Sequence, residues 1–93
     1  MAKKIASKSP VRIGNSVFIR TVTMYYTGRI VEITDACLIL EDAAWIADTG
    51  RFSAALKSGL LGEVEPYHAP VAISLQHVLD ITDWSHSLPR DVK

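Results

Sequence analysis

The pattern of apolar and polar residues between positions 17 and 46 is typical of β-strands. Val, Ile, Thr, Tyr and Phe dominate this stretch, and their branched or aromatic side chains pack well on a pleated sheet. Residues 16–34 are too many for one straight strand, so we predict a reversal near residues 21–23. Gly14-Asn15 offers a competing turn, in which residues 11–13 would pair with residues 17–19.

The strand is then interrupted by Gly28, where a missing side chain marks a sharp bend or a bulge. Ile30 and Ile33 are three residues apart, so strict alternation would place them on opposite faces, whereas a bulge lets both point inward. Thr34-Asp35 predicts a tight polar turn, after which the chain returns as a strand. Short strands that curl in this way form a small barrel rather than a flat sheet.

The remaining chain divides into an insertion and two last strands. Residues 47–70 form the insertion, with a helix expected at about 50–58, because Asp48 or Thr49 can cap its start and Gly59 its end. Residues 71–82 alternate as two short strands joined by a tight corner near residues 74–76. We expect residues 1–12 to form a basic arm or a short helix, and residues 85–93 to form a loose tail.

The charges are unevenly distributed, although the formal net charge is zero. The first 31 residues carry no acid and six cations, and the rest carries ten acids and four cations. If the basic third lies on one face, it offers a positive surface for a polyanion; the alternative is a solvated tail. The six cations are Lys3, Lys4, Lys8, Arg12, Arg20 and Arg29.

The sequence offers no site for catalysis. Cys37 is the only cysteine, which excludes an intramolecular disulfide and suits a reducing cytoplasm. The N-terminal residues lack an apolar signal core, and no stretch is long and apolar enough to cross a membrane. The three histidines are nine residues apart, a spacing that matches no metal-ligand geometry, and phosphate-loop and nucleophile motifs are absent. We therefore expect a cytoplasmic protein that is neither an enzyme nor a cofactor carrier.

Two stretches, residues 17–46 and 71–82, resemble the two motifs of the Sm and LSm proteins, and their turn length is closest to the bacterial Hfq branch. The first motif is matched by Gly28, Ile30, Ile33, Asp35, Leu38 and Leu40, and the second by Val71, Ile73, Val78 and Ile81. The resemblance implies a mostly-β, five-stranded, strongly bent antiparallel barrel of the SH3-like type, in one domain. It also implies a cyclic homo-oligomer, in which the fourth strand of one copy pairs with the fifth strand of the next.

The same resemblance implies that single-stranded RNA is bound at two places on one face of the ring: the turn after the second strand and the corner between the last two strands. Phosphate attraction would come from the basic arm. The RNA-binding residues expected on this basis are Thr34, Asp35, Ala36, Ser74, Gln76, His77, Lys3, Lys4, Lys8 and Arg12.

Four positions differ from the family pattern. Asp35 is displaced by one place within the turn where the family keeps its aspartate. Ser74 and Leu75 stand where the family has its arginine and glycine, and Ala36 stands where the Hfq branch has an aromatic residue. Three functions therefore remain open. They are a ring that binds RNA, a ring that serves as a protein-interaction scaffold without RNA, and a monomeric SH3-like peptide binder.

Overall fold

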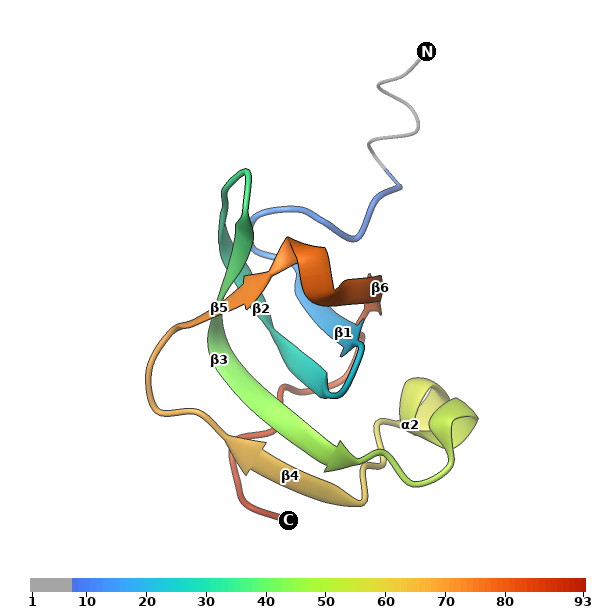
Figure 1. Cartoon of the computed structure of the whole chain (residues 1–93). Helices are drawn as coiled ribbons and strands as arrows, with labels where there is room; N and C mark the ends of the chain where they lie inside the picture. The colour runs from blue at the N-terminus through green and yellow to red at the C-terminus, as the bar shows by residue number, and fades with distance from the viewer. Residues whose placement is uncertain (1–7) are drawn as a thin grey trace.

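The structure, a computed structural model, describes residues 8–93, which form six strands and one α-helix (Figure 1). The mostly-β class is confirmed, but the strands number six rather than five, and they form one open curled sheet rather than the expected barrel. The elements in chain order are β1 (Ser16–Thr21), β2 (Tyr25–Ile33), β3 (Cys37–Asp48), α2 (Phe52–Ser58), β4 (Glu63–Pro66), β5 (Val71–Ser74), the 3₁₀ turn η1 (Leu75–His77) and β6 (Val78–Asp83).

All strands belong to one antiparallel sheet in the order β4-β3-β2-β1-β6, with β5 also paired to β3. β5 pairs with residues 37–40 of β3, and β4 pairs with residues 44–48 of the same strand. The two short strands therefore follow one another along one edge of β3. β4 is the strand that the sequence pattern missed, because only Val64 is apolar in its four residues and Gly62 and Pro66 suggest a turn.

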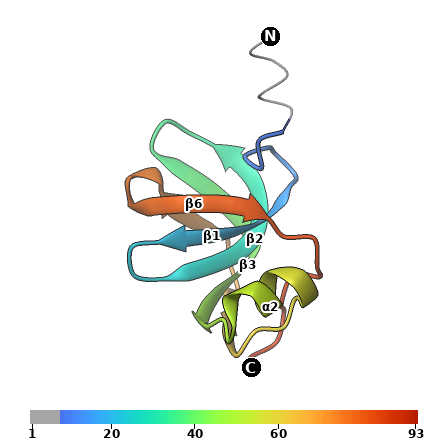
Figure 2. The ribbon, with the colours of Figure 1, turned by 90° about the vertical axis from the view of Figure 1, so that its right-hand side faces the viewer.

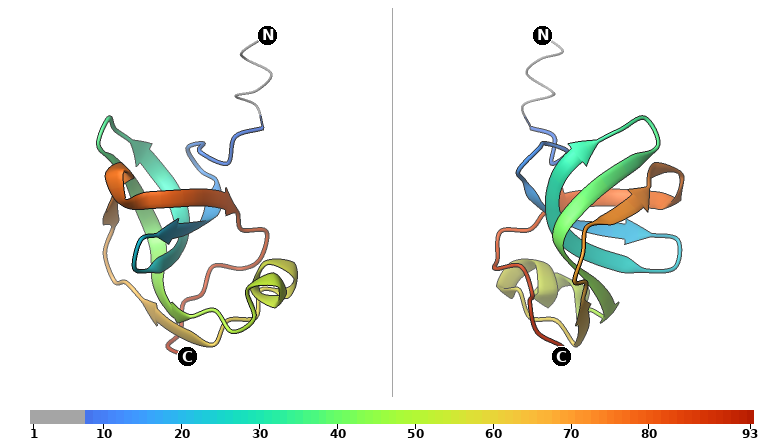
Figure 3. Two further views of the ribbon diagram at one scale, coloured as in Figure 1. Left: turned by 45° about the vertical axis from the view of Figure 1, so that its right-hand side comes forward. Right: turned by 90° about the vertical axis from the view of Figure 1, so that its left-hand side faces the viewer.

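The expected bend in β2 is present. The pairing of β2 with β3 shifts register between Thr27 and Arg29 and again between Ile30 and Glu32, as β-bulges do. A Cβ atom on Gly28 would lie 3.0 Å from Cβ of Leu40, so the glycine is needed for close approach of the two strands. Figure 3 shows the sheet curling around its own interior, while no pairing joins β6 to β4 or β5.

Ile30 and Ile33 face the same side of the curled sheet but differ in burial. Ile30 pairs with Leu40 and is fully buried, whereas Ile33 pairs with buried Leu38 and yet remains 42% exposed. Directly opposed residues share a face, so the bulge does turn both side chains inward. Ile33 stays exposed because it ends β2 beside the turn, beyond the packed core.

The core consists of two clusters within the curl. The first contains Val17, Ile19, Ile30, Leu38, Leu40, Ala43 and Ile73. The second contains Phe18, Ala44, Ile46, Ala55, Leu61, Val64 and Trp84. Helix α2, which forms within the range expected for the insertion, covers the second cluster with Ala55, and Figure 2 shows it beside one end of the sheet.

The first reversal lies where the sequence predicts it. The N–H of Thr21 donates to the carbonyl oxygen of Met24 at 2.8 Å, which closes the turn between β1 and β2. The competing arrangement at Gly14-Asn15 is wrong. The chain does turn there, but Gly14 and Asn15 exchange backbone hydrogen bonds with Ile30, so this segment extends the pairing of β1 with β2.

The prediction of a loose C-terminal tail is also wrong. Trp84 is 3% exposed, and its indole N–H donates to the carbonyl oxygen of Ser87 at 3.1 Å. His86 lies 2.8 Å from the carbonyl oxygen of Leu56 at the end of α2, and Leu88 packs against the second cluster. The polar composition of the tail concealed these anchors, which are single residues separated by exposed ones. Of the expected N-terminal arm or helix, residues 1–7, with Lys3 and Lys4, lie outside the described residues, and residues 8–12 form no helix.

Within residues 8–93, no helix is long and apolar enough to span a membrane.

Candidate functional site

The turn between β2 and β3 is organised by the hydroxyl of Thr34. Its oxygen accepts hydrogen bonds from the N–H groups of Ala36 at 3.2 Å and Cys37 at 2.9 Å. The N–H of Thr34 in turn donates to the carbonyl oxygen of Cys37 at 2.9 Å. These bonds close a tight turn, so that Asp35 and Ala36 form its exposed tip.

The corner between β5 and β6 is the 3₁₀ turn η1. Ser74 precedes it in an extended conformation and is half-buried, while Gln76 and His77 are exposed. The carbonyl oxygen of His77 accepts a hydrogen bond of 3.2 Å from the N–H of Val22 in the β1–β2 turn. The corner is therefore fixed to the neighbouring hairpin through its backbone, and its polar side chains are left in solvent.

The structure brings the β2–β3 turn and the η1 corner together. The N–H of Leu75 donates to the carbonyl oxygen of Ala36 at 2.9 Å, and Cys37 is directly opposite Ser74 in the pairing of β3 with β5. Figure 2 shows both turns at the same end of the molecule, together with the β1–β2 turn. The six residues expected at these turns thus lie on one end: Thr34, Asp35, Ala36, Ser74, Gln76 and His77.

A groove of about 410 Å³ lies beside this corner. Its lining joins the β1–β2 turn, Tyr26, residues 72–74 and His77. Val22 and Met24 are 66% and 40% exposed at its rim. Our sequence reasoning did not identify the groove. Two apolar residues within a predicted turn were the available signal, because turn tips are usually polar.

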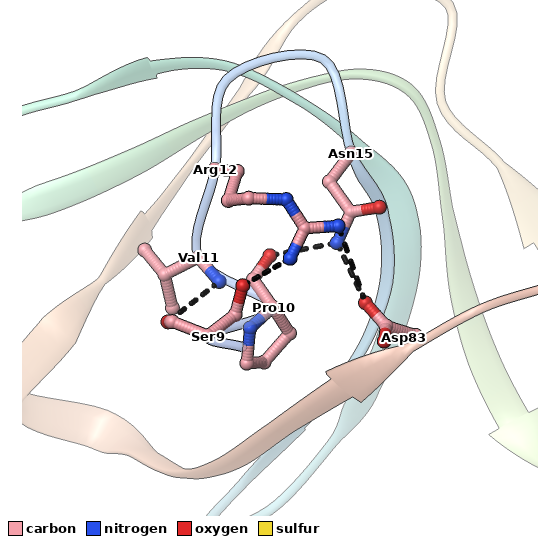
Figure 4. Close-up of polar contacts among 6 residues, drawn as sticks. All are labelled: Ser9, Pro10, Val11, Arg12, Asn15 and Asp83. Atoms are coloured by element: carbon pink, nitrogen blue, oxygen red, sulfur yellow. Dashed lines mark hydrogen bonds and ion pairs between the residues drawn. The ribbon is translucent and has the colours of Figure 1, made fainter. Parts of the chain in front are cut away.

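Arg12, at the described end of the basic N-terminal segment, does not reach this corner. A guanidinium nitrogen of Arg12 lies 3.9 Å from a carboxylate oxygen of Asp83, and the same side chain donates to the carbonyl oxygen of Ser9 (Figure 4). The side-chain amide of Asn15 also donates to Asp83. Asp83 ends β6, whereas His77 immediately precedes the start of that strand. Six residues of extended chain span roughly 17 Å, so Arg12 and the η1 corner are at opposite ends of β6. Lys8 is exposed.

The other arginines of the basic third are paired with acids. Arg20 forms a bidentate contact with Asp80, and Arg29 contacts Glu41 at 3.1 Å and also Asp42. These contacts lower the pKa of Asp42 and Asp80, chiefly through the hydrogen bonds from Arg29 and Arg20. The expected continuous positive surface is therefore not found among residues 8–31.

The exposed acids near the site have the sign that repels phosphate. Asp35 lies at the tip of the β2–β3 turn, and Glu32 is exposed near the end of β2. The side chain of His77 in η1 adds hydrogen-bonding capacity to this corner. The arrangement is suited to hydrogen bonding and apolar contact rather than to attracting a polyanion.

The outer edges of the sheet are the second notable feature. The N–H of Leu75 donates to the carbonyl oxygen of Ala36, so the backbone groups of Leu75 face β3. Backbone groups alternate between the two sides of an antiparallel strand, and those of Ala72 and Ser74 therefore point away from β3. No strand of the described chain pairs with that side of β5 or with the outer side of β6. The outer side of β4 differs, because Val64 exchanges two backbone hydrogen bonds with Lys93.

The described residues hold no cluster of three or more His, Cys, Asp or Glu side chains that could bind a metal ion. Comparison with known proteins gives no match to a family model, to a curated protein or to a solved structure.

Proposed function

We propose that this chain is a non-catalytic Sm-like protein that assembles into a homo-oligomeric ring and serves as a scaffold for protein partners. The observation that carries the proposal is the pair of uncovered strand edges, β5 on one side of the curled sheet and β6 on the other. Unpaired strand edges are templates for pairing with another chain. Pairing β6 of one copy with β5 of the next is a head-to-tail contact, which closes into a ring when the rotation permits.

The bend in β2 supports an Sm-like arrangement of these strands. In this proposal, β4 and β5 together take the place of the fourth strand of the five-stranded barrel, because they follow one another along one edge of β3. β6 takes the place of the fifth, and η1 takes the place of the corner between them. The interrupted fourth strand accounts for the difference in strand number.

The scaffold is favoured over RNA binding by the electrostatics of the described residues. Arg20 and Arg29 are neutralised by acids, and Arg12 lies against Asp83. Exposed apolar residues remain beside the free edges, among them Leu79 on β6, which is 61% exposed, and Val22. Apolar groups next to open backbone are the combination that protein interfaces use.

The test of assembly is the mass of the intact species, measured by light scattering over a range of protein concentrations. We expect a closed oligomer rather than the 10.2 kDa chain. Ala72→Pro removes one N–H that points away from β3, a substitution that edge strands tolerate, and should shift the protein to monomer without unfolding it. Ala72→Ser is the matched control, since it keeps the N–H. A species of about 10 kDa at every concentration would instead favour the monomeric peptide binder.

Single-stranded RNA is the second candidate, and the polar set at η1 favours it. Ser74, Gln76 and His77 offer donors and acceptors that suit unpaired base edges, and Tyr26 in the adjacent groove offers an aromatic surface. A fluorescence anisotropy titration with U-rich and A-rich RNA, at low and moderate salt, distinguishes the candidates. Binding that is lost in Gln76→Ala and His77→Ala would support RNA at this corner, whereas no binding at low salt would support the scaffold.

Loss of binding on changing Lys3, Lys4 and Lys8 to Ser, with Gln76 and His77 intact, would instead assign the RNA to the basic arm. Arg51→Ser is a control for the loss of an exposed cation elsewhere, because Arg51 is exposed on the insertion and forms no ion pair within residues 8–93.

A further inference from the structure

The outer edge of β4 is occupied by the end of the C-terminal segment. The N–H of Val64 donates to the carbonyl oxygen of Lys93 at 2.9 Å, and the N–H of Lys93 donates to the carbonyl oxygen of Val64 at 3.0 Å. This reciprocal exchange is the hydrogen-bonded pair of an antiparallel ladder. Figure 1 shows the chain reaching β4 after passing behind the sheet. We call residues 87–93 the strap.

The strap is attached at a few points only. Arg90 forms an ion pair of 2.9 Å with Asp42, but the Arg90 side chain is 66% exposed, and exposed ion pairs contribute little. Leu88 is half-buried against the second core cluster, while Val92 is 70% exposed.

A solvent-open groove of about 430 Å³ lies between the strap and Gly59, Leu61 and Val64. The end of the strap is therefore held by the Lys93–Val64 pair and the Arg90 ion pair, whereas Leu88 remains packed against the second core cluster.

The strap covers one of two adjacent edges. Val64 directs both its N–H and its C=O away from β3, because the neighbouring pair Trp45–Glu65 faces inward. By the same alternation, Pro66 directs only a C=O outward, since proline has no N–H. The matching outward groups of β5, those of Ala72 and Ser74, have no strand opposite them. A second copy can thus pair with the four residues of β5 at once, but it reaches the four residues of β4 only after the strap has moved.

We propose that the strap and a second copy of this chain compete for the outer edge of β4, so that the strap limits assembly until it is released. This inference rests on the assembly proposed above. The second copy is the fitting occupant because its β6 is an uncovered strand of six residues, longer than β5 alone can pair. The bonds made by Lys93 demonstrate that the edge accepts an antiparallel strand at Val64.

The test uses two substitutions at one residue. Lys93→Pro removes the N–H that Val64 accepts, and the proline ring also restricts the backbone. Lys93→Ser removes the same side chain and charge but keeps the N–H, so it is the matched control. Arg90→Ala is a second release variant, with Arg51→Ala as its control for the lost charge.

Two measurements are made on each full-length variant. Hydrogen exchange at the amide of Val64 reports whether the strap is bound, and the amide of Tyr67, which donates to the carbonyl oxygen of Ala43 at 2.8 Å, is the internal reference. Light scattering over a dilution series gives the dissociation constant of the assembly.

We expect Lys93→Pro to accelerate exchange at Val64 but not at Tyr67, and to tighten assembly about tenfold, as two added backbone hydrogen bonds would. Lys93→Ser should match the unmodified protein in both measurements. Arg90→Ala should act in the same direction as Lys93→Pro, with a smaller change.

Three results would overturn the inference, and they separate it from the proposed function. If exchange at Val64 accelerates in an assembling protein and the dissociation constant is unchanged, the strap does not compete and the ring stands. If Val64 exchanges in the unmodified monomer as fast as an open amide, the strap does not hold the edge. If no variant assembles at any concentration, the ring itself is wrong and the competition with it.

Discussion

The N–H of Leu75 donates a hydrogen bond of 2.9 Å to the carbonyl oxygen of Ala36. This bond joins two turns that are almost forty positions apart in the chain and places both at one end of the sheet. It also sets the alternation by which Ala72 and Ser74 direct their backbone groups outward. One contact thus determines both the candidate corner and the open edge.

Leu75→Pro tests the contribution of that bond. Leu75 is the first residue of η1. Ser74 before it is extended, with φ −67° and ψ 125°, which is the region that a following proline favours. The backbone should therefore accept proline, and the specific loss is the N–H. We expect the free energy of unfolding of Leu75→Pro to be about 1 kcal/mol lower than that of Leu75→Ala, which loses the same packing but keeps the hydrogen bond. Equal stability in urea denaturation would contradict this assignment.

Gly28→Ala should destabilise the fold although it adds one methyl group. The new Cβ would lie 3.0 Å from Cβ and Cδ1 of Leu40 and 3.3 Å from the backbone Cα of Ala43. Since backbone cannot yield as a flexible side chain does, we expect a loss of about 1–3 kcal/mol, measured by urea denaturation. Ala47→Val is the control, because Ala47 is exposed on β3 and should tolerate added methyl groups with little change.

Thr27→Val should leave the stability unchanged or raise it, by about 1 kcal/mol. Thr27 is fully buried, and its hydroxyl oxygen has no hydrogen-bond partner among residues 8–93, so replacing the hydroxyl with a methyl group of similar size removes a desolvated polar atom.

Thr21→Val is the opposite case. The hydroxyl of Thr21 donates to the carbonyl oxygen of Met24 at 2.8 Å and accepts a hydrogen bond of 3.0 Å from the N–H of Met24. We expect thermal unfolding to show a lower midpoint for Thr21→Val and an equal or higher one for Thr27→Val. The reverse order would refute the assigned hydrogen bonding.

Ile30→Ala and Ile33→Ala test whether burial, rather than the direction in which a side chain faces, sets the loss of stability on truncation. Ile30 is fully buried in the first core cluster, so its truncation leaves a cavity and should cost about 2–5 kcal/mol. Ile33 faces the same side but is 42% exposed, and its truncation should cost less than about 1 kcal/mol. Chemical denaturation of both variants provides the comparison. Similar losses of stability at the two positions would mean that Ile33 is buried, for example against another copy in an assembly. Repeating the measurement on the dissociated protein would identify burial by assembly.

The stability should fall in acid through Asp42 and Asp80. Arginine hydrogen bonds hold the pKa of each carboxyl below its ordinary value of 3.8 in the folded chain. A pKa depressed by folding contributes stability that is present above the unfolded value and lost as the pH falls through the folded one. The urea midpoint should therefore decline as the pH is lowered below about 4, and Asp42→Asn and Asp80→Asn should each flatten that decline. Added salt should weaken the same contribution, because both pairs are solvent-exposed.

Much of the fold follows from local pattern. The β-branched and aromatic run predicts the first three strands, Gly28 predicts the bulge, and Gly59 marks the end of α2, where it adopts the left-handed conformation with φ 74°. The two turns of the candidate site are predicted by their residues, but their contact is not, since it depends on the register of β5 along β3.

The sequence by itself determined where the chain bends and which side chains can enter a core, because glycine sterics and apolar spacing act within a few residues. Only the tertiary structure decided which charged side chains pair with one another and which strand edges are covered. Arg20, Arg29 and Arg12 meet acids that are distant in the sequence, so the basic run does not become a continuous basic surface among residues 8–31. Likewise, Lys93 lies at the edge of β4 because the core seats Trp84 and Leu88, an outcome of long-range packing that no local pattern encodes.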